Sequence, residues 1–312
     1  MRSHSRASLI DYFLNSGLTR RLTDTTLSGC LSQMLRIRRM RRRDIPFAIR
    51  LTNLEKWGVS RADLERLIFL NPKGNFIASL DGRRVGMMTT TSYGKKIAWI
   101  GNVVVMKRLR GQNIGKRLME HAVSSIRSSG VRRIALYCFS GNVRFYTKLG
   151  FVIDKKFFRL RRTPQTSMHR FEIDPKRRPS LTRMLTIDRE AFGADRSKLL
   201  QRLVTEKLVA IFDSDGMSYL IVKSYTDMSE FGPWVGITPF DKNDGRLIKS
   251  VTARYGRKTI EASCLASNAR ILKLLRKEGF QITNAGFRMY HAEKEEVGHD
   301  QSNYLLGFLD KG

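Results

Sequence analysis

The stretch that decides the fold contains three consecutive valines, Val103, Val104 and Val105, followed after a short basic turn by Arg110-Gly111-Gln112-Asn113-Ile114-Gly115-Lys116. It lies between a strand-like run and a segment with the periodicity of an amphipathic helix. The N-terminus of a helix carries several unpaired N–H groups and about half a positive charge, which favours a bound anion. The sequence therefore predicts a phosphate-binding loop between a strand and a helix.

The residue types in this loop suit that interpretation. Gly111 and Gly115 allow the backbone to approach a phosphate closely, and Asn113 tolerates a left-handed conformation almost as well as glycine does. Arg110 and Lys116 add positive charge to the same turn. Glycine is common between a strand and a helix, so the loop alone leaves an ordinary structural turn as an alternative.

The segments around the loop have the mixed order of an α/β protein. The tight Asp81-Gly82 turn between two strand-like runs indicates a hairpin. Asp44 and Ser60 suit the N-cap positions of two helices. The expected elements of the first half are helices at 45–53, 62–69, 114–128 and 143–149, and strands at 36–38, 75–80, 84–91, 96–105, 133–138 and 151–160.

The loop resembles the signature of the GNAT superfamily of acetyl-CoA-dependent N-acetyltransferases, Arg/Gln-x-x-Gly-x-Gly/Ala. Arg110, Asn113 and Gly115 match it, with Asn113 where the first signature glycine usually stands. The family's later motif, an aromatic pair followed by Gly-Phe, is matched by Phe145-Tyr146 and Gly150-Phe151. Both motifs occur in the family's order.

This resemblance covers residues 34–162 and implies an α/β (α+β) GNAT fold with a mixed central sheet flanked by helices. It also implies direct transfer of an acetyl group from acetyl-CoA, the co-substrate, to a primary amine of a small molecule or peptide. Tyr146 would protonate the departing thiolate; the alternative is a tyrosine that only packs in the core. The residues that the resemblance assigns to acetyl-CoA are Val103, Val104, Val105, Arg110, Gly111, Gln112, Asn113, Ile114, Gly115 and Lys116.

The second half repeats the element order of the first. Residues 163–180 have the composition of a linker, and the segments Lys148-Leu149-Gly150-Phe151 and Lys277-Glu278-Gly279-Phe280 both end a helix and enter a strand. We therefore expect a structural duplication. The expected elements of residues 181–312 are helices at 199–206, 244–255 and 268–278, strands at 208–213, 218–223, 258–263 and 287–290, and a glycine-rich segment at 231–236.

Residues 181–312 also resemble the C-terminal domain of the YitH/HolE-type tandem GNATs, through segments such as Ala191-Phe192-Gly193. This half has no Arg-x-x-Gly-x-Gly loop, and Leu275 stands where the first half has Tyr146. The resemblance therefore implies a degenerate GNAT-like domain without a phosphate loop, which shapes the acceptor pocket.

Candidates for the acceptor side are few, because the predicted strand at 96–105 has no carboxylate that could take a proton from an ammonium group. Glu55 lies in a predicted loop beside Trp57, and the alternative is a solvated surface glutamate. In the second half Asp195 and Arg196 could reach the acceptor, and the alternative is a helix cap and a structural ion pair. A water relay is a further alternative for the base.

The charge of the chain is extreme, since 58 Lys and Arg against 28 Asp and Glu give a net charge of +30. Such an excess favours polyanionic partners. The basic runs Arg38–Arg43 and Arg159–Arg162 keep open a nucleic-acid-associated protein, although no motif for specific recognition accompanies them. A catalytically inactive acyl-CoA-binding GNAT-like protein is the other alternative.

The remaining features concern the cellular setting. Cys30, Cys138 and Cys264 stand far apart, which excludes a disulfide framework and a thiolate zinc site, so we expect no metal. No apolar run is long enough for a membrane span. Residues 1–33 form a basic, Ser/Thr-rich tail with the composition of a disordered segment. We expect a cytoplasmic protein, with a mitochondrial transit segment as the alternative, and leave a homodimer open.

Overall fold

The structure is a computed structural model, and it describes residues 34–165, 180–206, 209–214, 216–237, 240, 242–292 and 297–312. These residues belong to one compact unit that extends from Met34 to Gly312. The predicted tail at 1–33, and residues 166–179 of the predicted linker, lie outside the described residues.

The first half follows the predicted order of helices and strands. Helix α1 begins at Ile45 as predicted, and Ser60 caps α2 through its hydroxyl. Asp44 directly precedes α1, but its carboxylate accepts hydrogen bonds from Arg38 instead of capping the helix. The elements are β1 (Leu35–Arg39), α1 (Ile45–Asn53), α2 (Arg61–Leu70), β2 (Phe76–Leu80), β3 (Arg83–Tyr93), β4 (Ile97–Val105), α3 (Ile114–Ser128), β5 (Arg133–Phe139), α4 (Val143–Thr147) and β6 (Phe151–Arg162).

The second half repeats this order with three differences from the prediction. Helix α5 was not predicted, the glycine-rich segment at 231–236 continues a strand, and a short additional strand follows β11. The elements are α5 (Leu181–Phe192), α6 (Ser197–Val204), β7 (Val209–Ser214), β8 (Ser218–Ser224), β9 (Met228–Gly236), α7 (Lys242–Tyr255), β10 (Thr259–Leu265), α8 (Ala269–Lys277), β11 (Gln281–His291) and β12 (Asn303–Leu305).

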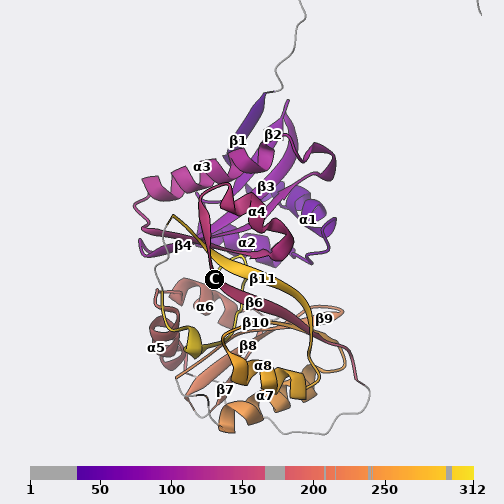
Figure 1. Ribbon diagram of the computed structural model, residues 1–312, viewed down its shortest axis with the longest axis vertical. Helices are drawn as coiled ribbons and strands as arrows, with labels where there is room; N and C mark the ends of the chain where they lie inside the picture. The colour runs from indigo at the N-terminus through magenta and orange to yellow at the C-terminus, as the bar shows by residue number, and fades with distance from the viewer. Residues whose placement is uncertain are drawn as a thin grey trace, which may run out of the picture. The chain divides into compact units, whose positions relative to one another are not determined.

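The described strands form one mixed sheet in the order β1-β2-β3-β4-β5-β11-β6-β10-β9-β8-β7, with β12 beside β9. The last strands of the two halves are exchanged, since β11 lies between β5 and β6, and β6 pairs with β10. Figure 1 shows these two long strands side by side in the middle of the molecule. The two halves therefore share one continuous sheet, and the predicted mixed sheet flanked by helices is confirmed.

The geometry of the two halves supports the predicted duplication. Each half contains one parallel strand pair, β4 with β5 and β9 with β10, and a helix connects the two strands of each pair. Gly150 and Gly279, which end the matched helices, adopt left-handed φ angles of 81° and 85°. Glycine is favoured at such a helix end because other residues are strained there.

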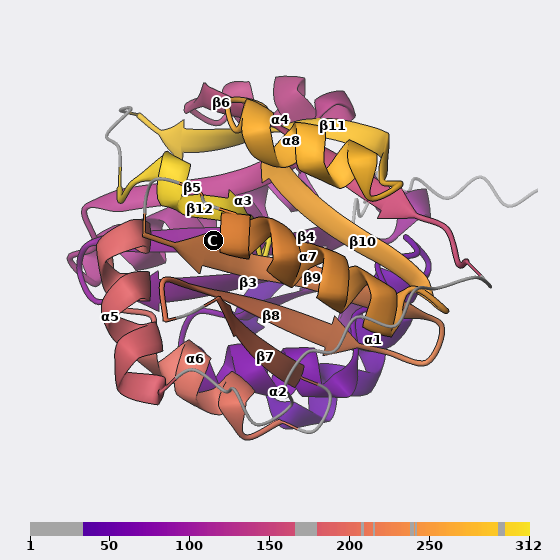
Figure 2. The same ribbon diagram turned by 90° about the horizontal axis from the view of Figure 1, so that it is seen from below.

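Strand β4 separates two hydrophobic cores, because successive side chains of a strand point to opposite faces. Ala98 and Ile100 pack with residues of α3 in one core. Ile97 and Trp99 pack on the other face with residues of α5 and α6. Figure 2 shows α6 beside α2, and the two helices are in contact. The second half therefore covers the face of β4 that α3 leaves free.

Candidate active site

The predicted phosphate loop has the geometry of an anion site. Gly111 has a φ of 83°, and Asn113 adopts the left-handed conformation with a φ of 59°, as its residue type predicts. Helix α3 begins directly afterwards, at Ile114, and Asn113 makes no side-chain capping bond to it. The first N–H groups of α3 are therefore available to a ligand, because they have no partner within the helix.

Arg110 connects this loop to β4 and to the end of α1. Its Nε donates to the carbonyl of Val105 at 3.1 Å, and its Nη2 lies 2.6 Å from Oε1 of Glu55. Glu55, a predicted acceptor-side residue, is thus placed next to the phosphate loop and paired with one of its basic side chains. Its neighbour Trp57 is largely exposed. Lys116, the other basic residue of the loop, pairs with Glu120 along α3 at 3.8 Å.

We use the term cleft for the place where two parallel strands cease to pair, and the first cleft lies between β4 and β5. These strands pair only over Ile97–Ile100 and Arg133–Leu136. A bulge at Asn102, with a φ of 51°, then turns β4 away, while Val104 and Val105 remain paired with β3 on the other side. The edge of β4 at Val103–Val105 therefore has no paired strand on its β5 side among the described residues. Such an edge can pair with the amides of an extended ligand.

Tyr146, the predicted acid, lies on α4 near the same cleft. Its ring packs edge-on against Phe145 and Phe151, with centroid distances of 5.0 and 6.0 Å. In the part of the chain that the structure describes, its hydroxyl has no hydrogen-bond partner. Burial, and secondarily the Cys138 thiol, raise the pKa of Tyr146 above the ordinary value of a phenol. The hydroxyl is therefore protonated at neutral pH and can donate its proton.

Residues 308–312 cover the face of β4 that lies opposite α3. A methyl group at Gly101 would lie 2.5 Å from Cβ of Asp310, so only glycine allows this close approach. The hydroxyl of Tyr93 donates to the carbonyl of Lys311 at 2.8 Å, and Nδ2 of Asn102 donates to Oδ2 of Asp310 at 2.9 Å. This segment therefore lies directly beside the bulge of β4.

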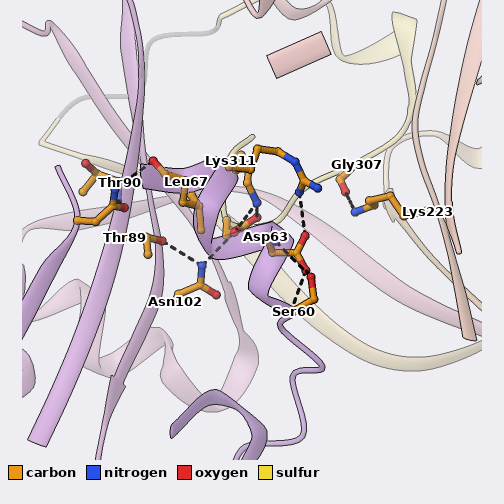
Figure 3. Close-up of polar contacts among 12 residues, drawn as sticks. Ser60, Asp63, Leu67, Thr89, Thr90, Asn102, Lys223, Gly307 and Lys311 are labelled. Carbon is orange, nitrogen blue, oxygen red and sulfur yellow. Dashed lines mark hydrogen bonds and ion pairs between the residues drawn. The ribbon is translucent and has the colours of Figure 1, made fainter. Parts of the chain in front are cut away.

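Polar side chains of α2 lie near Lys311, as Figure 3 shows. Asp63 accepts a hydrogen bond from the hydroxyl of Ser60 at 2.6 Å and lies 2.8 Å from Nη1 of Arg66. Burial alone would raise the pKa of Asp63, but Lys311, Ser60 and Arg66 together lower it well below its usual range. Lys223 of β8 donates to the carbonyl of Gly307 at 3.1 Å. Both halves thus contribute charged groups to this region.

Asp195 and Arg196 have the contacts of a cap and a structural pair. Asp195 accepts the N–H of Ser197 at 2.8 Å at the start of α6, and its side chain is 56% exposed. Arg196 is buried and forms a two-pronged ion pair with Asp188. It also donates to the carbonyl of Gly312 at 2.8 Å. Arg196 therefore contacts the segment 308–312, which in turn lies on β4.

The basic runs singled out in the sequence are partly neutralised within the chain. Arg38 pairs with Asp44, and Arg159 binds both Glu230 and Glu261. Arg161 pairs with the same Glu261 at 2.7 Å. Through these ion pairs, the basic run at 159–162 of β6 is held against β9 and β10.

The cleft between β9 and β10, which corresponds to that between β4 and β5, is filled by the chain itself. Strand β12 pairs with β9 at Val235 and Trp234, and Leu306 forms a bridge to Ser263 of β10. A methyl group at Gly232 would lie 2.5 Å from the carbonyl oxygen of Leu306. The second cleft therefore holds residues 303–306 where the first has an unpaired strand edge.

Sequence reasoning missed the role of residues 303–312, because no local pattern distinguishes three residues of strand from a loop. One signal was present. Gly101 stands inside a strand of larger residues, and such a glycine often marks the close approach of another backbone. Asn102, Asp310 and Lys311 could only be connected with β4 once the chain had folded.

Two GNAT family models match the chain. The acetyltransferase (GNAT) family matches residues 37–151, and an acetyltransferase (GNAT) domain matches residues 184–305. The chain therefore belongs to the GNAT acetyltransferase family and contains two GNAT domains in tandem. The two matched domains support the N-acyltransferase that the sequence motifs predict.

Three similar proteins illustrate the match. A protein of Pyrococcus horikoshii has a TM-score of 0.75 and 20% identity, over 95% of this chain and 100% of that one. A tandem GNAT protein from the clavulanic acid biosynthesis pathway has a TM-score of 0.59 and 12% identity, over 84% and 100%. Serotonin N-acetyltransferase 2, chloroplastic, from Oryza sativa subsp. japonica is 36% identical over 77 residues, which are 25% of this chain and 38% of that protein.

None of the helices in the described part of the chain is both long and apolar enough to cross a bilayer.

Proposed function

We propose that the protein transfers the acetyl group of acetyl-CoA directly to a primary amine of a small molecule or a peptide. One observation carries this proposal: the edge of β4, which has no partner strand on its β5 side among the described residues, leads into a left-handed loop at the N-terminus of α3, and Tyr146 packs against the same hydrophobic core as Val103. Acetyl-CoA could use all three features, because it has amides for the strand edge, a diphosphate for the loop and a thioester whose departing thiolate needs a proton donor. The family's use of acetyl-CoA supports the choice of the acyl donor.

The loop would bind the diphosphate of acetyl-CoA through main-chain N–H groups between Gly111 and Lys116. The fit is supported by Gly111, where an added methyl group would meet no atom within 4 Å, and by Gly115, where it would lie 3.4 Å from the ring of Phe145. Space therefore remains around the first of these positions, and the second is bounded by an aromatic ring. Arg110 adds a charge that Glu55 balances in the free protein.

The edge of β4 would hold the pantetheine arm and polarise the thioester. Backbone groups at Val103 and Val105 can pair with its amides as a neighbouring strand would. A backbone N–H aimed at the carbonyl oxygen stabilises the negative charge that develops there, and one such donor contributes about 3–4 kcal/mol. Since the bulge at Asn102 releases Val103 from β5, this part of the edge is available.

Tyr146 would supply the proton that the departing thiolate needs. Its raised pKa keeps the phenol protonated, and no partner among the described residues competes for its hydrogen. Proton transfer by a positioned side chain contributes about 10²–10⁴-fold to a rate. The name of the plant relative, a serotonin N-acetyltransferase, supports an amine as the acceptor.

The experiment that tests this function has two readouts. We expect acetyl-CoA to raise the melting temperature of the protein, and the double variant Arg110→Ala, Gly115→Asp to lose that effect. Thiol release from acetyl-CoA in the presence of a panel of primary amines then distinguishes an enzyme from a protein that only binds acyl-CoA. Stabilisation without thiol release for any amine would favour the binding protein, and no stabilisation would contradict both.

A further inference from the structure

Residues 303–312 connect the two clefts of the molecule. Residues 303–306 fill the cleft between β9 and β10, and residues 308–312 continue across β4 on the face opposite α3. Beyond this segment, the cavity lined by Trp99, Tyr137 and Tyr290 has a volume of about 20 Å³, which holds about one water molecule. An acceptor on this face must therefore share the site with residues 308–312 or displace some of them.

The segment places a primary ammonium group at this site. Nζ of Lys311 lies 2.8 and 2.7 Å from the two carboxylate oxygens of Asp310, and the side chain of Lys311 is only 3% exposed. The same Nζ lies 5.2 Å from the ring centroid of Phe308. Asp63 is close enough for Lys311 to lower its pKa. Carboxylates and an aromatic face are the groups that bind a desolvated ammonium.

The position of Asp310 connects this ammonium with the chemistry. Its backbone lies on Gly101, and its Oδ2 accepts a hydrogen bond from Asn102, the bulge residue that directly precedes Val103. Because the same Oδ2 also accepts from Lys311, the ammonium group and the bulge residue share one carboxylate oxygen. Strand β4 itself has no carboxylate in this region, so Asp310 supplies from the second half what β4 lacks.

We propose that Asp310 binds the ammonium group of the acceptor, and that Lys311 occupies this place until the acceptor displaces it. This assignment rests on the proposed acetyl transfer and adds the chemical class of the acceptor. The acceptor is an unhindered primary alkylamine in its cationic form, similar in shape to the end of a lysine side chain. The side chain of Asp310 is 23% exposed and therefore reachable from solvent.

Butylamine is a suitable probe, because it has the same aminobutyl end as Lys311. We measure its dissociation constant by calorimetry on protein saturated with CoA, and its KM and the KM of acetyl-CoA by thiol release. Lys311→Met keeps the length of the side chain and removes its charge. This variant should bind butylamine about three- to tenfold more tightly than the natural chain, with the KM of acetyl-CoA unchanged, because an internal competitor is gone.

Asp310→Asn should weaken butylamine binding about ten- to a hundredfold, which is the usual loss for a hydrogen bond to a charged group, and Asp310→Glu should restore part of it. Asp227→Asn, at an exposed turn between β8 and β9, is the matched control and should change neither constant. Melting temperatures check that all variants are folded.

The two variants together separate recognition from structural support. If Lys311→Met bound butylamine no better than the natural chain, or if Asp310→Asn bound it equally well, the assignment of Asp310 would be wrong. Both binding measurements proceed without turnover. A protein that binds CoA and butylamine as expected but releases no thiol would therefore contradict the proposed acetyl transfer and still support the amine site.

Discussion

The two clefts of this molecule have the same strand framework and opposite contents. Between β4 and β5, the edge at Val103–Val105 has no partner strand among the described residues and leads into a left-handed loop. Between β9 and β10, β12 pairs with the corresponding edge, and Leu306 completes the filling. Backbone N–H and C=O groups at a strand edge require partners. The second cleft finds them within the chain, and we infer that the first finds them in acetyl-CoA.

The residues around the clefts differ in the same way. Leu275 of α8 is fully buried where α4 carries Tyr146, so the second half has an apolar side chain in place of a phenol. Trp234 and Phe231 are also fully buried, and they form part of the second core. We infer from this comparison that the second domain has kept the fold without a ligand site, because its own chain occupies the place of the ligand.

The largest expected effect is on Tyr146. Tyr146→Phe should lower kcat by about 10²–10⁴-fold, because the departing thiolate loses its proton donor. The dissociation constant of acetyl-CoA should remain within about twofold, since the ring and its packing are kept. Stopped-flow or steady-state thiol release measures the first quantity and calorimetry the second. Full turnover by this variant would show that the cleft of the first half works without the assigned acid.

The pH dependence follows from the same residue. Because burial raises the pKa of Tyr146, its phenol remains protonated above the pH at which an ordinary tyrosine titrates, about pH 10. The acid is lost only as the pH rises through this raised value. We therefore expect kcat to show no alkaline decline below about pH 10. A decline between pH 7 and 9 that is absent in Tyr146→Phe would contradict the raised pKa.

The next effect compares the two helices that follow the clefts. Gly115→Asp should weaken acetyl-CoA binding by about a hundredfold, because it adds a negative charge beside the diphosphate and a side chain next to Phe145. Gly245→Asp in the first turn of α7 is the matched control, because an added methyl group there meets no atom within 4 Å. Equal losses in both variants would mean that the clefts are not distinguished as we infer.

A substitution that disturbs the residues in the second cleft should lower the stability of the protein. Gly232→Ala should lower the free energy of unfolding by about 2–4 kcal/mol, since the new methyl group would lie 2.5 Å from the carbonyl oxygen of Leu306 and the backbone there has a φ of 128°. Gly111→Ala should lower the free energy of unfolding by only about 1 kcal/mol, because φ is also positive at Gly111 but an added methyl group there would meet no atom within 4 Å. Urea unfolding compares the two variants, and an equal loss of stability would argue against close packing of Leu306 on Gly232.

The smallest effect concerns Glu55. Glu55→Gln should tighten acetyl-CoA binding about two- to fivefold, because Arg110 is freed from an exposed ion pair worth at most about 1 kcal/mol. The KM of the amine should not change. If the amine KM rose instead, Glu55 would belong to the acceptor side, as its sequence position beside Trp57 suggests.

Local signals account for the parts that could be predicted from the sequence. The start of α3, the left-handed Asn113 and the turn at Asp81-Gly82 depend on neighbouring residues, and the structure confirms them. Helix α5 was missed although Ser180 and Gly193 cap it, because its first residues follow a stretch with the composition of a linker. In β9, Gly232 and Pro233 conceal a strand from propensity alone.

Non-local pairing explains what could not be predicted. The exchange of β6 and β11 leaves the order of elements unchanged, so no sequence pattern distinguishes it from two separate sheets. The approach of Asp310 to Gly101 joins residues more than two hundred positions apart. For the same reason the sequence does not show that Asp195, a predicted acceptor residue, accepts the N–H of Ser197 at the start of α6, or that the carboxylate next to the bulge of β4 is that of Asp310.

The stoichiometry of CoA binding tests the central claim most directly. Calorimetric titration of the purified protein with CoA should give one site per chain, and Gly115→Asp should weaken binding at this site about a hundredfold. Two sites per chain would contradict the filled second cleft. No binding at all would contradict the assignment of the first cleft, and the open edge of β4 would then need another ligand.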